Sequence, residues 1–217
     1  MNYSLKRTIM KRKITFTIIL TAILAGTTLS VGAQQISGGI KGGLTMSNFY
    51  VGQDDIDDEN ARFGLNAGLF GQIMFFETFG IQHEILYSAK GTEVVYGGLI
   101  DQTVNFKLNY LDFPVLMVIR PVEILEIHAG AYLGLLLSAK TEYSGTIEGN
   151  DEISRDNFNT LDYGIGAGVA LNFGNMQTGI RYNLGLQKLA KSDVANLLLG
   201  DSKNAFGQLY IAFRFNN

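Results

Sequence analysis

The chain has 217 residues, 47% of them hydrophobic and 17% charged, which suits one folded domain and excludes a disordered chain. The formal net charge is −3 at pH 7, unlike the strongly basic balance of nucleic-acid-binding proteins. There is no cysteine, so disulfides, thiolate catalysis and cysteine metal sites are excluded.

Residues 1–33 have the features of a cleaved export signal. Three basic residues at 11–13 precede the apolar run ITFTIILTAILAG, and the small residues of SVGA end at Ala33. We therefore expect cleavage after Ala33 and a mature domain at 34–217. A membrane anchor is the alternative, but the run is shorter than the ~20 residues of a spanning helix. Met10, directly before the basic cluster, is an alternative start.

Loss of this segment would make the chain acidic. Residues 1–33 hold five Lys or Arg and no acid, so the mature chain has 12 basic and 20 acidic side chains and a formal charge of −8. This balance argues against nucleic acid as a partner. The mature chain has no long apolar run, so if it crosses a membrane we expect it to do so as a closed barrel.

Beyond the signal, apolar and polar residues alternate with a period of two, which is typical of extended strands. Helical periodicity is not found in these segments. Several segments exceed ten alternating residues, which suits strands that cross a bilayer at a tilt. The alternation predicts eight strands, at 36–49, 61–76, 79–95, 102–120, 125–140, 161–174, 176–187 and 208–215.

The third segment, GIQHEILYSAKG at 80–91, shows the pattern clearly. Ile81 and Ile85 fall on one face, whereas Glu84 and Lys90 fall on the other. In a membrane barrel the apolar face contacts lipid and the polar face lines the bore.

The fourth segment changes phase, because its apolar positions are even-numbered up to Tyr110 and odd-numbered from Leu111. The change lies beside Pro114 and predicts a β-bulge, which tolerates proline inside a sheet. In the sixth segment, Gly164, Gly166 and Gly168 recur every two residues. This spacing suits an inward strand face from which bulk is excluded, and it does not suit a phosphate-binding loop.

The connections alternate between short and long. Tight links are expected at 77–78, 121–123 and 174–175, and long polar connections at 50–60, 96–101, 144–157 and 190–203. Short periplasmic turns and long external loops are typical of outer-membrane barrels, so we expect both termini in the periplasm. Aromatic residues near segment ends are expected to form girdles at the two interfaces: Phe49, Phe75, Phe76, Phe79, Tyr110, Tyr143, Phe158, Phe173 and Phe215.

The bore of an eight-stranded barrel is narrow, and inward side chains fill it. Opposite charges there are expected to pair, because an unpaired buried charge costs several kcal/mol. We expect Glu84 to pair with an arginine of a nearby strand. A proton path or gated pore is the alternative role for these groups. The expected internal charge network comprises Glu84, Lys90, Arg120, Glu126, His128, Asp162, Arg181 and Arg214, with Lys41, Arg62 and Asp112 also inward.

The sequence gives little reason to expect catalysis. The only histidines are His83, expected to face lipid, and His128, expected in the bore, and no G-x-S-x-G nucleophile motif is present. The acidic run DDIDDE at 54–59 lacks the Gly and distal Glu of an EF-hand loop, so it is interpreted as a solvated loop. We assign no catalytic, cofactor-binding or metal-binding residue.

Seven pieces of the chain carry a resemblance to a known family: GIKGGLTMSNF, GIQHEILYSAKG, NYLDFPVLMVIR, GAYLGLLLSAK, DYGIGAGV, RYNLGLQKL and QLYIAFRF. From about Gly38 to Phe215 the chain resembles the PorT-like small outer-membrane β-barrels of Gram-negative bacteria. Two features depart from that family: Thr45 stands where Asn is common, and two asparagines follow Phe215. The resemblance implies the barrel and its membrane, and one branch of the family looks like a component of secretion and gliding machinery.

Together these observations predict an all-β protein, an eight-stranded antiparallel up-and-down transmembrane β-barrel after a cleaved signal peptide. The expected function is that of a non-enzymatic integral outer-membrane protein with a structural, adhesive or secretion-machinery-associated role. A small pore or transport component is the alternative, followed by a lipid-modifying enzyme and a soluble lipid-binding barrel. Outer-membrane lipid, lipopolysaccharide and other envelope proteins are the expected partners.

The membrane prediction can be checked by gel migration. A folded transmembrane barrel in the membrane fraction should migrate differently before and after heating. A soluble periplasmic protein with no shift on heating would contradict the prediction.

Overall fold

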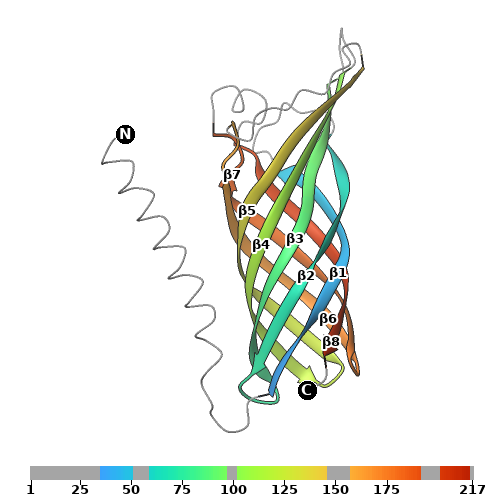
Figure 1. The fold of residues 1–217 in the computed structure, drawn as a ribbon, viewed down its shortest axis with the longest axis vertical. Helices are drawn as coiled ribbons and strands as arrows, with labels where there is room; N and C mark the ends of the chain where they lie inside the picture. The colour runs from blue at the N-terminus through green and yellow to red at the C-terminus, as the bar shows by residue number, and fades with distance from the viewer. Residues whose placement is uncertain (1–34, 51–58, 97–101, 146–156, 192–200, 216–217) are drawn as a thin grey trace, which may run out of the picture. The chain divides into compact units, whose positions relative to one another are not determined.

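The computed structural model describes residues 35–50, 59–96, 102–145, 157–191 and 201–215, which form one closed antiparallel barrel (Figure 1). The predicted signal, its cleavage after Ala33 and most of the long connections lie outside these residues. The part of the chain that is described contains no helix long and apolar enough to cross a membrane. The strands are β1 (Gln35–Tyr50), β2 (Glu59–Met74), β3 (Phe79–Tyr96), β4 (Gln102–Val122), β5 (Leu125–Gly145), β6 (Leu161–Phe173), β7 (Met176–Lys188) and β8 (Lys203–Phe215).

The topology is up-and-down, as the sequence predicted. Each strand pairs with its neighbours in sequence, and β1 pairs with β8 to close the circle. Short turns connect β2 to β3, β4 to β5 and β6 to β7 at one end of the barrel, which we call the turn end. Gly174 has a φ of 60° in the two-residue β6–β7 turn, a conformation that suits glycine. The last strand is longer than predicted and begins at Lys203.

The outer wall of the barrel is apolar. Along β6 and β7 the exposed residues alternate with buried or half-buried ones, and the exposed positions include Ile165, Val169 and Ile180. The buried positions of the same strands include Asp162 and Arg181. A soluble lipid-binding barrel would show the reverse arrangement, so the structure contradicts that alternative.

Inward glycines make room for large side chains of the adjacent strand. A Cβ on Gly168 would lie 2.6 Å from Nε2 of His128, and one on Gly179 would lie 2.6 Å from the hydroxyl oxygen of Tyr210. These contacts are too close for any real Cβ. The spacing of two among the glycines of β6 therefore serves close packing inside the bore.

The predicted bulge beside Pro114 is wrong. Pro114 pairs with Tyr132 in unbroken register, and the shift lies on β5, where Tyr110 pairs with Leu136 and the preceding pair is Asn109 with Ser138. In β4 the even-numbered residues from 106 to 118 all point inward. The apparent change of phase arose because the inward residues of the first half of β4 are apolar.

The prediction of aromatic girdles is confirmed only in part. Phe173 and Phe215 are exposed on the wall, and Phe76 is exposed in the turn between β2 and β3. Phe49, Tyr110 and Phe158, however, are no more than 2% exposed and lie inside the barrel. They belong to a cluster that we call the apolar plug, formed by Phe49, Phe106, Leu108, Tyr110, Leu136, Ala139, Phe158, Leu189 and Ala190.

Two adjacent glycines of β1 provide a test of this packing. A Cβ on Gly43 would overlap the carbonyl of Leu209 on β8, whereas a Cβ on Gly42 would lie 3.6 Å from its nearest atom. We expect Gly43→Ala to lower the free energy of unfolding by ~1–3 kcal/mol. Gly42→Ala should change it by less than ~0.5 kcal/mol. Urea titrations read by the unheated gel band would measure both, and equal effects would contradict the register.

Candidate functional site

The charged residues of the bore form three layers along the barrel, and the apolar plug begins at the level of the last layer, where Leu108 pairs with Lys90. The turn layer surrounds Glu126 near the turn end, the central layer surrounds Glu84, and the upper layer surrounds Lys90. Along β3, Glu84 lies five residues after Phe79 and Lys90 lies eleven residues after it, which gives the order of the last two layers.

The central layer joins opposite walls of the barrel. Nη1 and Nη2 of Arg181 donate hydrogen bonds of 2.8 and 2.7 Å to the two carboxylate oxygens of Glu84. Nζ of Lys41 donates a third bond of 3.0 Å, and all three side chains are fully buried. Glu84 is on β3 and Arg181 is on β7, four strands away in a circle of eight. The expected arginine of a nearby strand is therefore wrong, because the pair crosses the bore.

Arg181 and Glu84 form a bidentate ion pair, which is among the strongest polar contacts in proteins. A bidentate contact between a guanidinium and a carboxylate combines two charge-assisted hydrogen bonds with a fixed orientation. The pair is fully removed from water, so its net contribution is smaller than its Coulomb attraction. Loss of one partner is nevertheless costly, since it leaves a buried charge without compensation.

Two aromatic rings complete the central layer. Nζ of Lys41 lies 3.5 Å from the centroid of the Tyr210 ring, a cation–π contact. The rings of His128 and Tyr210 lie 6.3 Å apart. Neither nitrogen of His128 nor the hydroxyl of Tyr210 has a hydrogen-bond partner among the described protein atoms. The layer therefore places two basic side chains, Lys41 and Arg181, around one carboxylate.

The turn layer also places two basic side chains around one acid, but here both are arginines. Oε2 of Glu126 accepts hydrogen bonds from Arg120 at 3.2 Å and from Arg214 at 3.5 Å. The arginine side chains are 17% and 14% exposed, so this layer reaches the opening of the bore. Gln72 and Gln82 link it to the central layer, through bonds of 3.1 Å to Glu126, 3.0 Å between the two amides and 2.6 Å to Glu84.

The upper layer places two carboxylates around Lys90. Nζ of Lys90 lies 2.9 Å from Asp112 and 3.8 Å from Asp162. Asp162 also accepts hydrogen bonds from Tyr132 at 3.2 Å and from Asn204 at 2.8 Å. These bonds explain how two carboxylates share one buried ammonium group. Nη1 of the half-buried Arg62 donates to the carbonyl of Lys90 at 2.5 Å.

The apolar plug closes the end of the bore opposite the turns. Phe49 and Phe106 pack with ring centroids 5.9 Å apart. Phe158 and Ala190 come from two different connections and pair as an isolated β-bridge. The amide of Asn159 donates to the carbonyl of Leu189 at 2.9 Å beside this bridge. The plug is therefore held by two connections as well as by the strands.

All eight residues of the expected charge network lie in the bore. The structure joins them as Glu84 with Arg181, Lys90 with Asp162, and Glu126 with both Arg120 and Arg214, while His128 packs on Tyr210. The sequence reasoning missed the plug, and it missed the hydrogen bonds by which Gln72 and Gln82 link the layers, although the alternation puts both glutamines on the polar face. Asp112 and Arg120 are polar at even positions of β4, and this signal could have placed Phe106 and Leu108 inside as well.

Neither histidine belongs to a catalytic arrangement among the described residues. His83 lies on the outer face of β3, where its ring covers the backbone of Gly71. His128 lies in the bore without a hydroxyl partner. The described residues also contain no group of three or more His, Asp or Glu that could hold a metal ion. The run DDIDDE at 54–59 lies almost wholly outside them.

Comparisons with known proteins found one family and several solved structures that are similar to this chain. A family model described as "outer membrane protein beta-barrel domain" matches residues 32–191. Ail, the attachment invasion locus protein of Yersinia pestis, is 19% identical, with 83% of this chain and 99% of that chain covered and a TM-score of 0.47. Neisserial surface protein A is 11% identical, with 83% and 99% covered and a TM-score of 0.46. The search of curated proteins found no match.

The central pair can be tested by a double-mutant cycle. We expect Glu84→Gln to lower the free energy of unfolding by ~3–5 kcal/mol, because Arg181 and Lys41 are then buried without a counter-charge. The double variant Glu84→Gln/Arg181→Gln should lose at least ~1 kcal/mol less than the sum of the single variants. Urea titration of the unheated gel band is the measurement.

An exposed ion pair provides the control for this cycle. Lys188 and Asp201 form a bridge whose side chains are 52% and 66% exposed. Asp201→Asn should change the free energy of unfolding by less than ~1 kcal/mol. Strict additivity of the two central substitutions would contradict a direct interaction across the bore.

Proposed function

Because the chain belongs to the outer membrane protein beta-barrel domain family, we propose that it acts as a closed, non-enzymatic scaffold whose function is performed at its rims. It is an integral outer-membrane β-barrel protein. In such barrels the short turns face the periplasm and the longer loops face outside. We therefore place the turn layer at the periplasmic opening and the apolar plug at the external end.

The observation that carries this proposal is that the bore is closed at two levels. The central layer crosses it with Arg181, Glu84 and Lys41, all fully buried. The plug then packs Phe106 and Phe158 into the external end, beside the buried polar side chains of Ser47 and Thr92. A solute would have to break a buried ion pair and pass this packed end, so the bore does not favour a transport role.

At the external rim, three strands extend beyond the rest of the barrel wall. β5 pairs with β6 only up to Leu135, yet it continues to Gly145 in register with β4. Figure 1 shows β3, β4 and β5 running beyond the other strands at this end. A sheet that extends past the wall serves no need of the membrane span. It supports a structural, adhesive or machinery-associated role that uses the outer surface.

The proposal extends to the family, the partners and the non-enzymatic role of the protein. The order and spacing of the seven sequence pieces support membership of the PorT-like family of small outer-membrane barrels. Outer-membrane lipid contacts the apolar wall, and lipopolysaccharide and other envelope proteins are the partners proposed for the rims. A non-enzymatic role is supported by the positions of His83 and His128 on opposite faces of the wall. Purification in mild detergent, with identification of co-purifying proteins, tests the machinery-associated role.

Planar-bilayer conductance tests the closed bore against the pore alternative. The unmodified protein should give no steady current. Phe158→Ala alone should stay closed, because the central layer remains. Phe158→Ala combined with Glu84→Gln and Arg181→Gln should leak, because both closures are then weakened. A steady ion-selective current of the unmodified protein that disappears when Arg181 or Glu84 is changed would overturn the proposal.

A further inference from the structure

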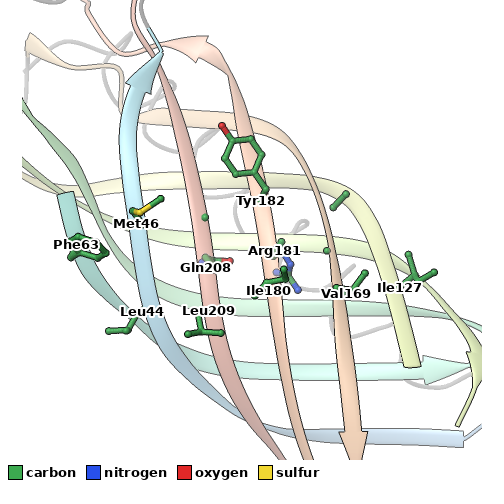
Figure 2. A pocket seen from close by; sticks show the side chains of 13 residues that line it. Leu44, Met46, Phe63, Ile127, Val169, Ile180, Arg181, Tyr182, Gln208 and Leu209 are labelled. Carbon is green, nitrogen blue, oxygen red and sulfur yellow. The ribbon is translucent and has the colours of Figure 1, made fainter. Parts of the chain in front are cut away.

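The outer wall carries an open groove with a volume of about 720 Å³. It crosses β1, β2 and β5 to β8, and Figure 2 shows its lining side chains. Arg181 and Gln208 reach it only from the inner face, since both side chains are buried in the bore. The outward side chains are apolar apart from the hydroxyl of Tyr182. They include Leu44, Met46, Ile180, Tyr182 and Leu209.

The groove exists because small residues flank one large ring. Tyr182 of β7 pairs with Ala167 of β6 on one side and with Gly207 of β8 on the other. Gly207 in turn pairs with Met46 of β1. The ring of Tyr182 therefore stands between two positions that have almost no side chain, and the wall is hollowed there.

Packing of the barrel does not require the glycine at position 207. A Cβ added there would meet nothing nearer than the carbonyl oxygen of Met46 at 4.0 Å. By contrast, a Cβ on Gly43 or Gly179 would overlap neighbouring groups. The missing side chain of Gly207 thus leaves space on the membrane side of the wall.

We propose that this groove binds one acyl chain of lipopolysaccharide from the outer leaflet. The inference rests on the proposed placement of the wall in the outer membrane. Water does not occupy an apolar groove in hydrocarbon, and an empty groove would forfeit the dispersion contacts of its lining. The only other material at this depth is a lipid chain or the wall of another protein.

The hydroxyl of Tyr182 indicates the orientation and the leaflet. It has no hydrogen-bond partner among the described residues, and a hydroxyl in hydrocarbon gains stability from one. In Figure 2 the ring points away from Ile180 and Leu209, in the direction in which β1 runs. That direction is external. Tyr182 is six residues beyond Met176, which is ~20 Å along the strand and ~15 Å of height at the usual tilt, so in a band ~25 Å tall its ring starts in the outer-leaflet half and points toward the polar groups of that leaflet.

The test uses the full mature chain in phosphatidylcholine vesicles that contain synthetic lipid A. After extraction in mild detergent, native mass spectrometry should show one lipid A retained per protein. Gly207→Leu places a side chain in the groove and should reduce retention at least fivefold. Tyr182→Phe keeps the ring but loses the hydroxyl, and it should reduce retention two- to fivefold.

Ala131→Leu is the matched control, because Ala131 is exposed on the same wall but does not line the groove. It should retain lipid A within twofold of the unmodified protein. Equal retention by Gly207→Leu, equal retention of phosphatidylcholine, or a pair of protein chains in place of lipid would each overturn the inference. A change of gel migration on heating shows whether each variant has folded and inserted as a barrel. A protein that inserts but retains no lipid A contradicts the proposed lipid groove and leaves the proposed outer-membrane scaffold unaffected.

Discussion

A chain that crosses a bilayer with strands must satisfy every backbone amide and carbonyl within the protein, since hydrocarbon offers no partner. Pairing of β1 with β8 from Gly38 to Tyr50 meets this requirement, because it leaves the sheet without an edge inside the membrane. The other features of the fold depend on that closure. Once the sheet is closed, each strand has one face toward lipid and one toward a bore too narrow for much water, and the polarity of the two faces is inverted relative to a soluble protein.

The enclosed, polar interior constrains how its charged groups are arranged. A buried charge without a partner costs several kcal/mol, so the charged groups of the bore gather in layers around shared counter-ions. Layers that join opposite walls also constrain which strands can face each other. Glu84 on β3 and Arg181 on β7 meet only if the barrel has its observed strand order. The pair thus favours one closed strand arrangement over arrangements with a shifted strand register. The backbone hydrogen bonds between neighbouring strands supply the stability of the wall.

The sequence predicted the strands and their topology because the period of two and the alternating loop lengths are local features. It did not predict the apolar plug, since hydropathy alone cannot distinguish an inward Phe106 from an apolar residue that faces lipid. It also misplaced the partner of Glu84, because distance along the chain carries no information about the opposite wall. The sequence also could not show the different roles of Gly43 and Gly207. Only the positions of neighbouring atoms show that packing requires a glycine at position 43 and does not require one at position 207.

Closure of the bore directs function to the surfaces that remain. The two layers with two basic groups around one acid lie toward the turn end, the layer around Lys90 follows, and the plug lies at the opposite end. At the level of the plug the bore also holds the buried polar side chains of Ser47 and Thr92, so closure there depends on tight packing as well as on apolar side chains. The features that the closed barrel does not itself need are the extension of β3 to β5 and the hollow beside Tyr182. One faces the exterior and the other faces lipid, so interactions at the cell surface and within the outer leaflet account for both.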